Sequence, residues 1–333
     1  MAEVEIDLVA DWHREIYRWF VDNCRVAKWK FANLRNKNLS DAIARNDFES
    51  ASENDRRALA SYYFNLQHRI VSRRRRKLEV QTEEELFANI PESLREKMRE
   101  GWAAFCREVV DGEDLSLRQT VNRFEIDGKD VLLDRLRIHH FHIQEIPKKR
   151  GDFVAYCFVS DDIVKVIALE THRAFNMPEL CQSVLERAYC LYPEEFSVFL
   201  IRAETSCGGV SLEEQKKLAW LNCNVPFVAA GRLFFPIGIG VMTNGVSAEA
   251  QMRMIKTSQL LKSAEKEMIS LFRSCQGDEE RRGLDVPDKI VMRLHRVTNS
   301  TVDARSEDGS IQATYDAGAQ RVELLYGERL LQL

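Results

Sequence analysis

The sequence predicts an α+β fold with a helical N-terminal region, a central small antiparallel sheet with packed helices, and a C-terminal β-meander. Apolar residues recur at helical spacing through the N-terminal third. Around Leu132 the apolar period changes from that of a helix to that of a strand. After residue 288, four short segments separated by turns, one at Asp308-Gly309, predict the meander.

The length of 333 residues favours more than one domain. We expect a helical domain over 1–130, a central α/β region over 131–275 and the meander over 288–333. The segment "SCQGDEERRGLDVPDK" between the last two is polar and carries glycines and a proline. That composition is typical of a linker, here about residues 275 to 288.

Amphipathic spacing and helix-start signals predict four helices in the N-terminal region. An amphipathic pattern over 7–31 predicts the first helix, and Ser52 with Asp55 resembles the cap of a second, through Ile70. Thr82 with Glu85 forms a capping box, and Pro91 starts a fourth helix. The cations at 73–77, "RRRRK", could contact RNA, but we favour a solvated helix end.

Alternating segments predict the central sheet. The segments 136–143, 152–159 and 163–172 are expected strands, the last two joined by a tight turn at 160–162. A helix with Pro178 in its first turn should follow. The later expectations are a strand at 196–204, a hairpin turning at Ala230-Gly231 and a helix from about Ser247 to Arg273.

Composition limits the classes of function. A formal charge of −4 predicts no general attraction to nucleic acid, so RNA binding would need a local basic patch. The first twenty residues carry acidic residues where a signal peptide needs basic ones, and the chain lacks an apolar run long enough for a membrane span. We therefore expect a cytoplasmic protein with no membrane association.

Four of the seven histidines lie between residues 139 and 172. Side chains alternate between the two faces of a strand, so His140 and His142 should share one face with Leu136 and Ile138. His139 should lie on the opposite face. His172 closes another strand of the same sheet and is the expected third member of a site.

Two imidazoles on one face can hold a divalent metal or act as base and acid on a phosphodiester. No nearby carboxylate or cysteine completes a metal-ligand set, so we predict no metal and no cofactor. Arg150 and Arg173 are the nearest cations for holding a phosphate, because guanidinium matches its oxygens. Histidines on a sheet can instead satisfy buried hydrogen bonds, and this structural interpretation stays open.

A glycine-rich segment, "GIGVMTNG", precedes the predicted long helix. Backbone N–H groups at a helix start can cradle a phosphate. The segment lacks the Walker lysine and does not match the dinucleotide fingerprint. We therefore expect Gly238, Gly240 and Gly245 to mark a hairpin end and a helix entry.

The order of elements in "KKRGDFVAYCFVSDDIVKVIALETHR", a basic loop, two apolar strands around an acidic turn and a terminal His-Arg, resembles the core of RelE-type toxins. Those are small bacterial ribonucleases with a β-sheet core. The whole arrangement, with its helical N-terminus, is also similar to uncharacterised bacterial proteins of mobile elements and phage defence. The first resemblance covers about 45 residues.

The toxin resemblance implies metal-independent RNA cleavage. His140 and His142 would be base and acid in either order, His172 would orient or share the proton transfer, and Arg150 and Arg173 would hold the phosphate. RNA and a protein partner or antitoxin are the expected partners. The alternatives are a non-enzymatic protein-interaction module in a defence or mobile-element complex, and a metal-dependent hydrolase using His140 and His142.

The eight cysteines are scattered, form no C-x-x-C pair and lie mostly in apolar segments. This pattern is typical of reduced, unligated core cysteines. We expect thiol titration of denatured, unreduced protein to give close to eight free thiols. Stoichiometric zinc in the purified protein would contradict the prediction.

Overall fold

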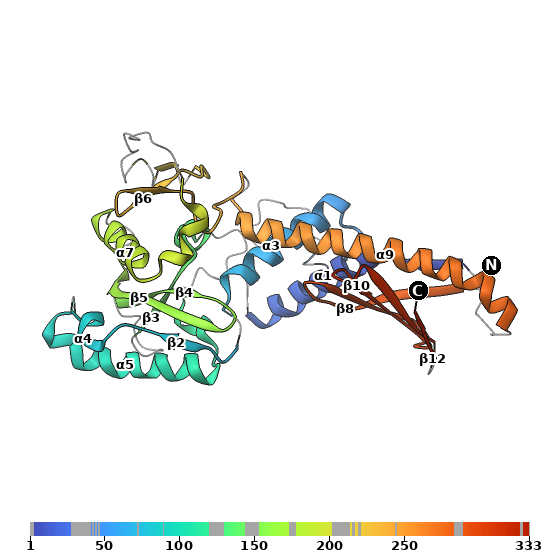
Figure 1. The fold of residues 1–333 in the computed structure, drawn as a ribbon, viewed down its shortest axis with the longest axis horizontal. Coiled ribbons are helices and arrows are strands. Elements are labelled where there is room, and N and C mark those ends of the chain that lie inside the picture. Colours follow the sequence, from blue (N-terminus) through green and yellow to red (C-terminus); the bar gives the residue numbers. More distant parts are fainter. Residues whose placement is uncertain are drawn as a thin grey trace. The chain divides into compact units, whose positions relative to one another are not determined.

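The structure is a computed structural model. It describes residues 3–27, 41, 43, 45, 47–71, 73–88, 90–119, 130–143, 153–172, 178–201, 214, 217–218, 221–243, 245–282, 289–326 and 329–332. Helices and sheets are mixed along the chain (Figure 1), which confirms the α+β fold. The chain divides into two compact units, Met1–Tyr63 with Met252–Leu333, and Phe64–Gln251.

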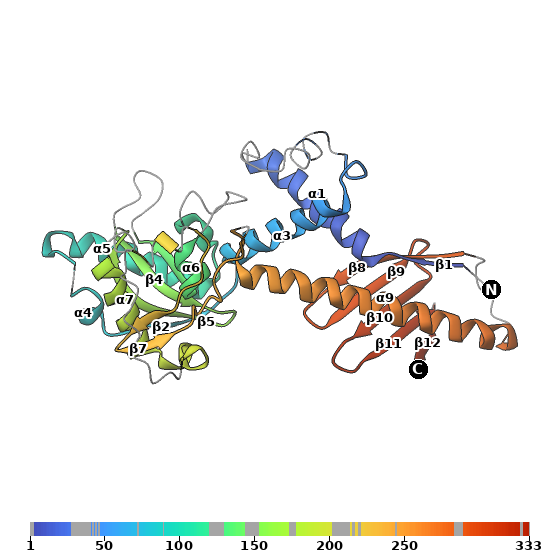
Figure 2. The same cartoon turned by 90° about the horizontal axis from the view of Figure 1, so that it is seen from above.

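The first unit joins the two ends of the chain in one six-stranded sheet, of order β1-β8-β9-β10-β11-β12. The first strand pairs parallel with β8, the pairs from β8 to β11 form the predicted antiparallel meander, and β12 extends it by one strand that was not predicted. Figure 2 shows these strands side by side. Their bounds are β1 Glu3–Ile6, β8 Lys289–Val297, β9 Thr301–Ser306, β10 Ile311–Asp316, β11 Arg321–Tyr326 and β12 Arg329–Gln332.

Helices α1 (Leu8–Ala27) and α9 (Ala248–Arg282) supply apolar faces to this unit. Asp11 of α1 accepts a hydrogen bond from the backbone N–H of Leu294 at 3.0 Å, and Glu265 of α9 accepts one from that of Val9 at 3.1 Å. The last helix continues to Arg282. The predicted linker is therefore wrong over 275–282, where the chain is helical, and 283–288 lies outside the described residues.

The second unit contains a four-stranded sheet of order β2-β5-β4-β3. Strands β3 (Ile138–His142), β4 (Phe153–Val159) and β5 (Ile163–Thr171) confirm the three predicted strands and their hairpin turn. The sequence did not predict β2 (Lys77–Glu79), which pairs parallel with β5. Each face of the sheet bears an apolar core. Helix α5 (Glu92–Asp111) supplies one and α7 (Pro178–Leu191) the other (Figure 1).

Both predicted N-terminal capping motifs are present. The Ser52 hydroxyl accepts from the N–H of Asp55 at 3.2 Å, and the Asp55 carboxylate accepts from the N–H of Ser52, at the start of α3 (Glu53–Arg69). The Thr82 hydroxyl accepts from the N–H of Glu85 and caps α4 (Glu83–Leu86). Helix α5 starts directly after Pro91, as predicted.

The arginine run after α3 is not a helix end, so that prediction is wrong. Residues 73–76 are non-helical and lead into β2. Arg74 pairs with Asp161 and Asp162 in the turn between β4 and β5. Arg76 is buried and donates to the carbonyl of Ser160 at 2.8 Å. Two of these cations therefore attach β2 to the hairpin turn.

The segment after α7 differs from its predicted strand. Single 3₁₀ turns occur at Pro193–Glu195 and Ser197–Phe199, and Leu200 forms an isolated bridge with Phe234. Residues 202–204 lie outside the description. The next hairpin is confirmed, with β6 (Phe227–Ala229) and β7 (Arg232–Phe234). Among the helices that the structure describes, none has the length and apolar character needed to cross a membrane.

The β6–β7 turn has left-handed backbone at Ala230 (φ 47°) and Gly231 (φ 71°), as a two-residue type I′ turn requires. We expect Ala230→Gly to raise the free energy of unfolding by about 0.5–1 kcal/mol. The released left-handed strain of about 1–2 kcal/mol exceeds the entropic cost of glycine, about 0.5–1 kcal/mol. Urea unfolding measures the change.

The matched control is Gly231→Ala. An added Cβ at Gly231 meets no atom within 4 Å, so the left-handed φ alone should lower stability, by about 1 kcal/mol. A loss of stability in Ala230→Gly would contradict this account of the turn.

Candidate active site

Strand β3 alternates between the two cores of the second unit. Ile138 belongs to the core beneath α7, together with Leu136, and Phe141 belongs to the core beneath α5, together with Ile143. These positions agree with the faces predicted for the strand. His140 and His142 follow Ile138 on the α7 face.

The structure brings the three predicted histidines together. The ring centroids of His140 and His172 lie 5.3 Å apart, with the planes at 62°. Those of His142 and His172 lie 5.1 Å apart and are stacked at 18°. His172 therefore contacts both histidines of β3, although β4 separates its strand from theirs.

A β-bulge explains why His172 reaches this face. Tyr156 of β4 pairs with Ala168 of β5, but the next residue of β4, Cys157, pairs with Val166. The register of the two strands therefore shifts by one residue between Tyr156 and Cys157. Ile167 is the extra residue, and both it and Ala168 belong to the α7 core. Strict alternation from Val166 would place His172 beneath α5; the bulge turns it toward His140.

The three imidazoles differ in exposure. His142 is 5% exposed, whereas His140 and His172 are half-buried. The Nδ1 atom of His140 is buried and has no hydrogen-bond partner among the described residues. Leaving a buried polar atom without a partner costs about 1–3 kcal/mol.

Two further polar side chains on this face were not predicted. Tyr156 lies directly opposite His140, and its hydroxyl donates to the carbonyl of Thr171 at 3.2 Å. Glu170 lies opposite Val154, itself the partner of His142. Counting alternate positions in "FVAYCFV" could have identified Tyr156. The bulge hides Glu170 from such a count.

The two predicted phosphate-binding arginines, Arg150 and Arg173, lie outside the described residues. They flank described segments that carry the site. Arg173 directly follows His172, and two residues separate Arg150 from the start of β4. Their role stays a prediction.

His139 lies on the opposite face of β3. Its ring stacks on Phe141 at 11° with centroids 5.9 Å apart, and its Nδ1 lies 3.5 Å from the Gln119 amide nitrogen. Burial lowers the pKa of His139 to about 3, with smaller contributions from His68 and His140. This imidazole is therefore neutral at physiological pH, and its contacts are those of a residue buried in the protein interior.

Behind the sheet edge, Asp134 of α6 (Val131–Leu136) lies 3.7 Å from Nε2 of His68. Burial raises the pKa of Asp134 to about 8, and the negative charge of Asp130 adds to the shift. A neutral contact is therefore favoured over an ion pair at pH 7. Both side chains are almost wholly excluded from solvent, which leaves no surface for a substrate.

The glycine-rich segment packs on α6. The N–H groups of Gly238 and Gly240 donate to the carbonyls of Arg135 and Asp134, both at 2.9 Å, and that of Gly245 donates to Met242. A Cβ at Gly238 would lie 2.3 Å from the Asp134 oxygen. These N–H groups are occupied, so the segment serves helix entry, as expected, and not phosphate binding.

Within the described segments, no group of three or more histidine, cysteine, aspartate or glutamate side chains is arranged to hold a metal ion. The described cysteines Cys106, Cys157, Cys190 and Cys223 are free thiols. Burial raises the pKa of Cys106 to about 11 and that of Cys157 further, which disfavours the thiolate needed for metal binding or nucleophilic attack.

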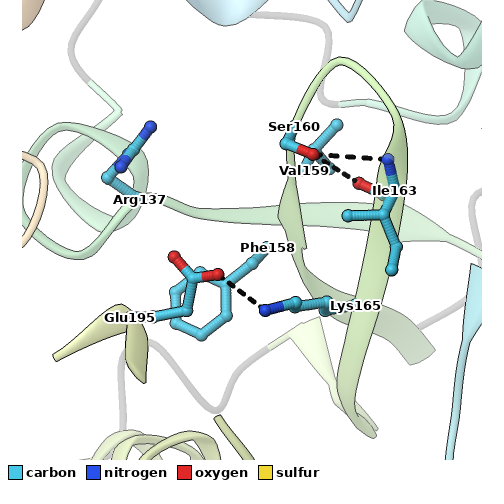
Figure 3. A pocket seen from close by; sticks show the side chains of 7 residues that line it. All are labelled: Arg137, Phe158, Val159, Ser160, Ile163, Lys165 and Glu195. Carbon is cyan, nitrogen blue, oxygen red and sulfur yellow. Dashed lines mark hydrogen bonds and ion pairs between the residues drawn. The ribbon is translucent and has the colours of Figure 1, made fainter. Parts of the chain in front are cut away.

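A separate pocket lies at the β4–β5 turn (Figure 3). Its empty volume is about 310 Å³, part of it open to solvent, and it is lined by Arg137, Phe158, Val159, Ser160, Ile163, Lys165 and Glu195. The ammonium of Lys165 points to the Glu195 carboxylate at 2.9 Å and also binds Glu194. None of the histidines lines this pocket. It adds no group to their chemistry.

Comparisons of the chain with protein-family models, curated proteins and solved structures found no match. The geometry of the second unit is therefore the main basis for a functional assignment.

Asp134 gives this region a testable pH dependence. The folded chain holds this proton up to about pH 8, whereas an unfolded chain releases it near pH 4. Its contribution to stability is therefore complete below about pH 4 and is lost as pH rises through 8. We expect the stability of Asp134→Asn relative to wild type to rise between pH 5 and 8, by at most about 1.4 kcal/mol per pH unit.

Urea unfolding at several pH values measures this difference. Asp111→Asn, the same substitution at an exposed position, is measured alongside as the control. A pH-independent difference for Asp134→Asn would contradict the buried, protonated carboxyl.

Proposed function

We propose that the second unit is a metal-independent ribonuclease centre, in an effector of the bacterial toxin or phage-defence type. The observation that carries the proposal is that the rings of His140 and His142 both lie against that of His172, with centroids 5.3 and 5.1 Å from it. Imidazole suits general acid–base chemistry because its pKa lies near physiological pH. The resemblance of this segment to RelE-type toxins supports the choice of RNA as substrate.

Exposure suggests how the histidines divide the work. Half-buried His140 and His172 can touch a phosphodiester, whereas His142 lies behind them, stacked on His172. One of these two half-buried imidazoles takes the proton of the 2′-hydroxyl, and that oxygen attacks the adjacent phosphorus. The other protonates the 5′-oxygen as it leaves. His142 holds the ring of His172 and shares its proton.

The developing negative charge on the phosphate requires a cation. Arg150 and Arg173 are the candidates because of their positions next to β4 and His172 in the chain. A guanidinium group can donate two parallel hydrogen bonds to two oxygens of one phosphate. RNA binding through these arginines would weaken as the salt concentration rises. The net charge of −4 makes the rest of the chain a poor binder of RNA.

Two alternatives predict different behaviour. A metal-dependent hydrolase using His140 and His142 would be inhibited by a chelator. A non-enzymatic interaction module would not cleave RNA. Incubating the purified chain with RNA, with and without chelator, separates these possibilities, and we expect cleavage that the chelator does not affect.

Single alanine variants of His140, His142 and His172 test the assignment. We expect each to lower the cleavage rate by about 10²–10⁴-fold, because a general acid, a base or its partner is lost. The His140 and His172 variants should melt near the wild-type temperature. His142 is buried, so its variant is expected to lose some stability as well.

His139→Ala is the internal control from the same strand. It should lose stability, because His139 is buried, but retain cleavage in the folded protein. Equal loss of activity in His139→Ala and His140→Ala at equal stability would refute the assignment by strand face. Joint destabilisation of all four variants would show that the histidines are structural.

A further inference from the structure

The strand that carries His142 is an edge strand. In the described sheet β3 pairs only with β4, and its last ladder bond runs from the N–H of Ile143 to the carbonyl of Phe153 at 3.3 Å. Edge strands and strand ends are held by fewer backbone bonds than central strands. Another contact must therefore fix the end of β3 if His142 is to keep its stacked position against His172.

Arg118 makes that contact. It ends the 3₁₀ turn η2 (Leu115–Arg118), and its side chain is 7% exposed. Nη1 donates to the carbonyls of His142 at 3.0 Å and Ile143 at 3.2 Å. One guanidinium nitrogen thus binds two consecutive carbonyls at the end of β3.

The guanidinium is itself fixed by α5. Nε and Nη2 of Arg118 donate to the two carboxylate oxygens of Glu108, at 2.5 and 2.6 Å. This bidentate geometry is open to arginine and closed to lysine, whose ammonium is a single point charge. Arg118 also lies over the ring of Phe105, 6.0 Å from its centroid.

Gly101 of α5 completes the arrangement. A Cβ at this position would lie 2.2 Å from the carbonyl oxygen of Ile143, closer than real side chains come. Glycine therefore lets the helix approach the strand end directly. The same carbonyl accepts from Arg118, so the helix and the guanidinium confine it together.

We propose that Arg118, anchored by Glu108, is a positioning residue that holds the end of β3 so that the His142 imidazole stacks on His172. The inference deepens the proposed function and rests on it only for its kinetic arm. Misplacing a catalytic group by about 1 Å can cost 10²-fold in rate, so a loosened strand end should lower kcat. KM should change little, since Arg118 is remote from solvent.

The test is Arg118→Lys, which keeps the charge but not the two-sided fork. Arg99→Lys is the matched control, because Arg99 lies on α5, the helix of Glu108, and pairs with Glu83 at 2.7 Å on an exposed surface. The readouts are the imidazole resonances of His142 and His172 in the folded protein by NMR, and kcat and KM for RNA cleavage. We expect Arg118→Lys to shift both sets of resonances and to lower kcat about 10–100-fold at nearly constant KM.

Glu108→Gln is the second variant and keeps the fold accessible should Arg118→Lys not fold. Glu108 is partly exposed, and its loss should shift the same resonances less. The inference would be overturned if the His142 and His172 resonances are unchanged in both folded variants, or if Arg99→Lys changes them equally. It would also be overturned if every folded variant loses chemical-shift dispersion across the whole spectrum. If the wild-type chain cleaves no RNA, the proposed function fails, and the NMR comparison still decides the role of Arg118.

Discussion

The register of β3 against β4 is the constraint on which the candidate site depends. The sheet of the second unit bears an apolar core on each face, so the apolar residues of β3 must enter one core or the other. A slip of one residue would exchange the histidines with Phe141 and Ile143 and bury imidazoles among aromatic rings. The apolar residues thus specify the face on which His140 and His142 lie, and the histidines need not specify it themselves.

Part of the site follows from the sequence, because strand alternation is a local property. The spacing of His140 and His142 predicts their common face, and Ile138 and Phe141 confirm the two faces. The convergence with His172 does not follow in the same way. It depends on the bulge at Ile167, and no residue in "IVKVIALETH" marks an extra position. A bulge is a compromise between two cores, and only the packed structure shows it.

Contacts between distant segments were the least predictable part of the fold. The helix caps at Ser52 and Thr82 could be identified because their partners lie three residues away. The pairing of β1 with β8 joins segments from the two ends of the chain. Strand β1 is only four residues long, and its sequence does not indicate this partner. The run at 73–77 was misinterpreted for the same reason. Its cations bind Asp114 and the β4–β5 turn, and those partners are not neighbours in sequence.

Several buried polar groups of the second unit are either ion-paired or uncharged at pH 7. The charge of Arg118 is balanced by the Glu108 carboxylate, to which it is hydrogen-bonded. The raised pKa of Asp134 leaves its carboxyl protonated at pH 7. His139 is held neutral by burial down to about pH 3. This last point bears on the site, because His139 and His140 are adjacent and a charge on one opposes a charge on the other. His139 therefore places no positive charge beside the histidines on which the proposed acid–base chemistry would depend.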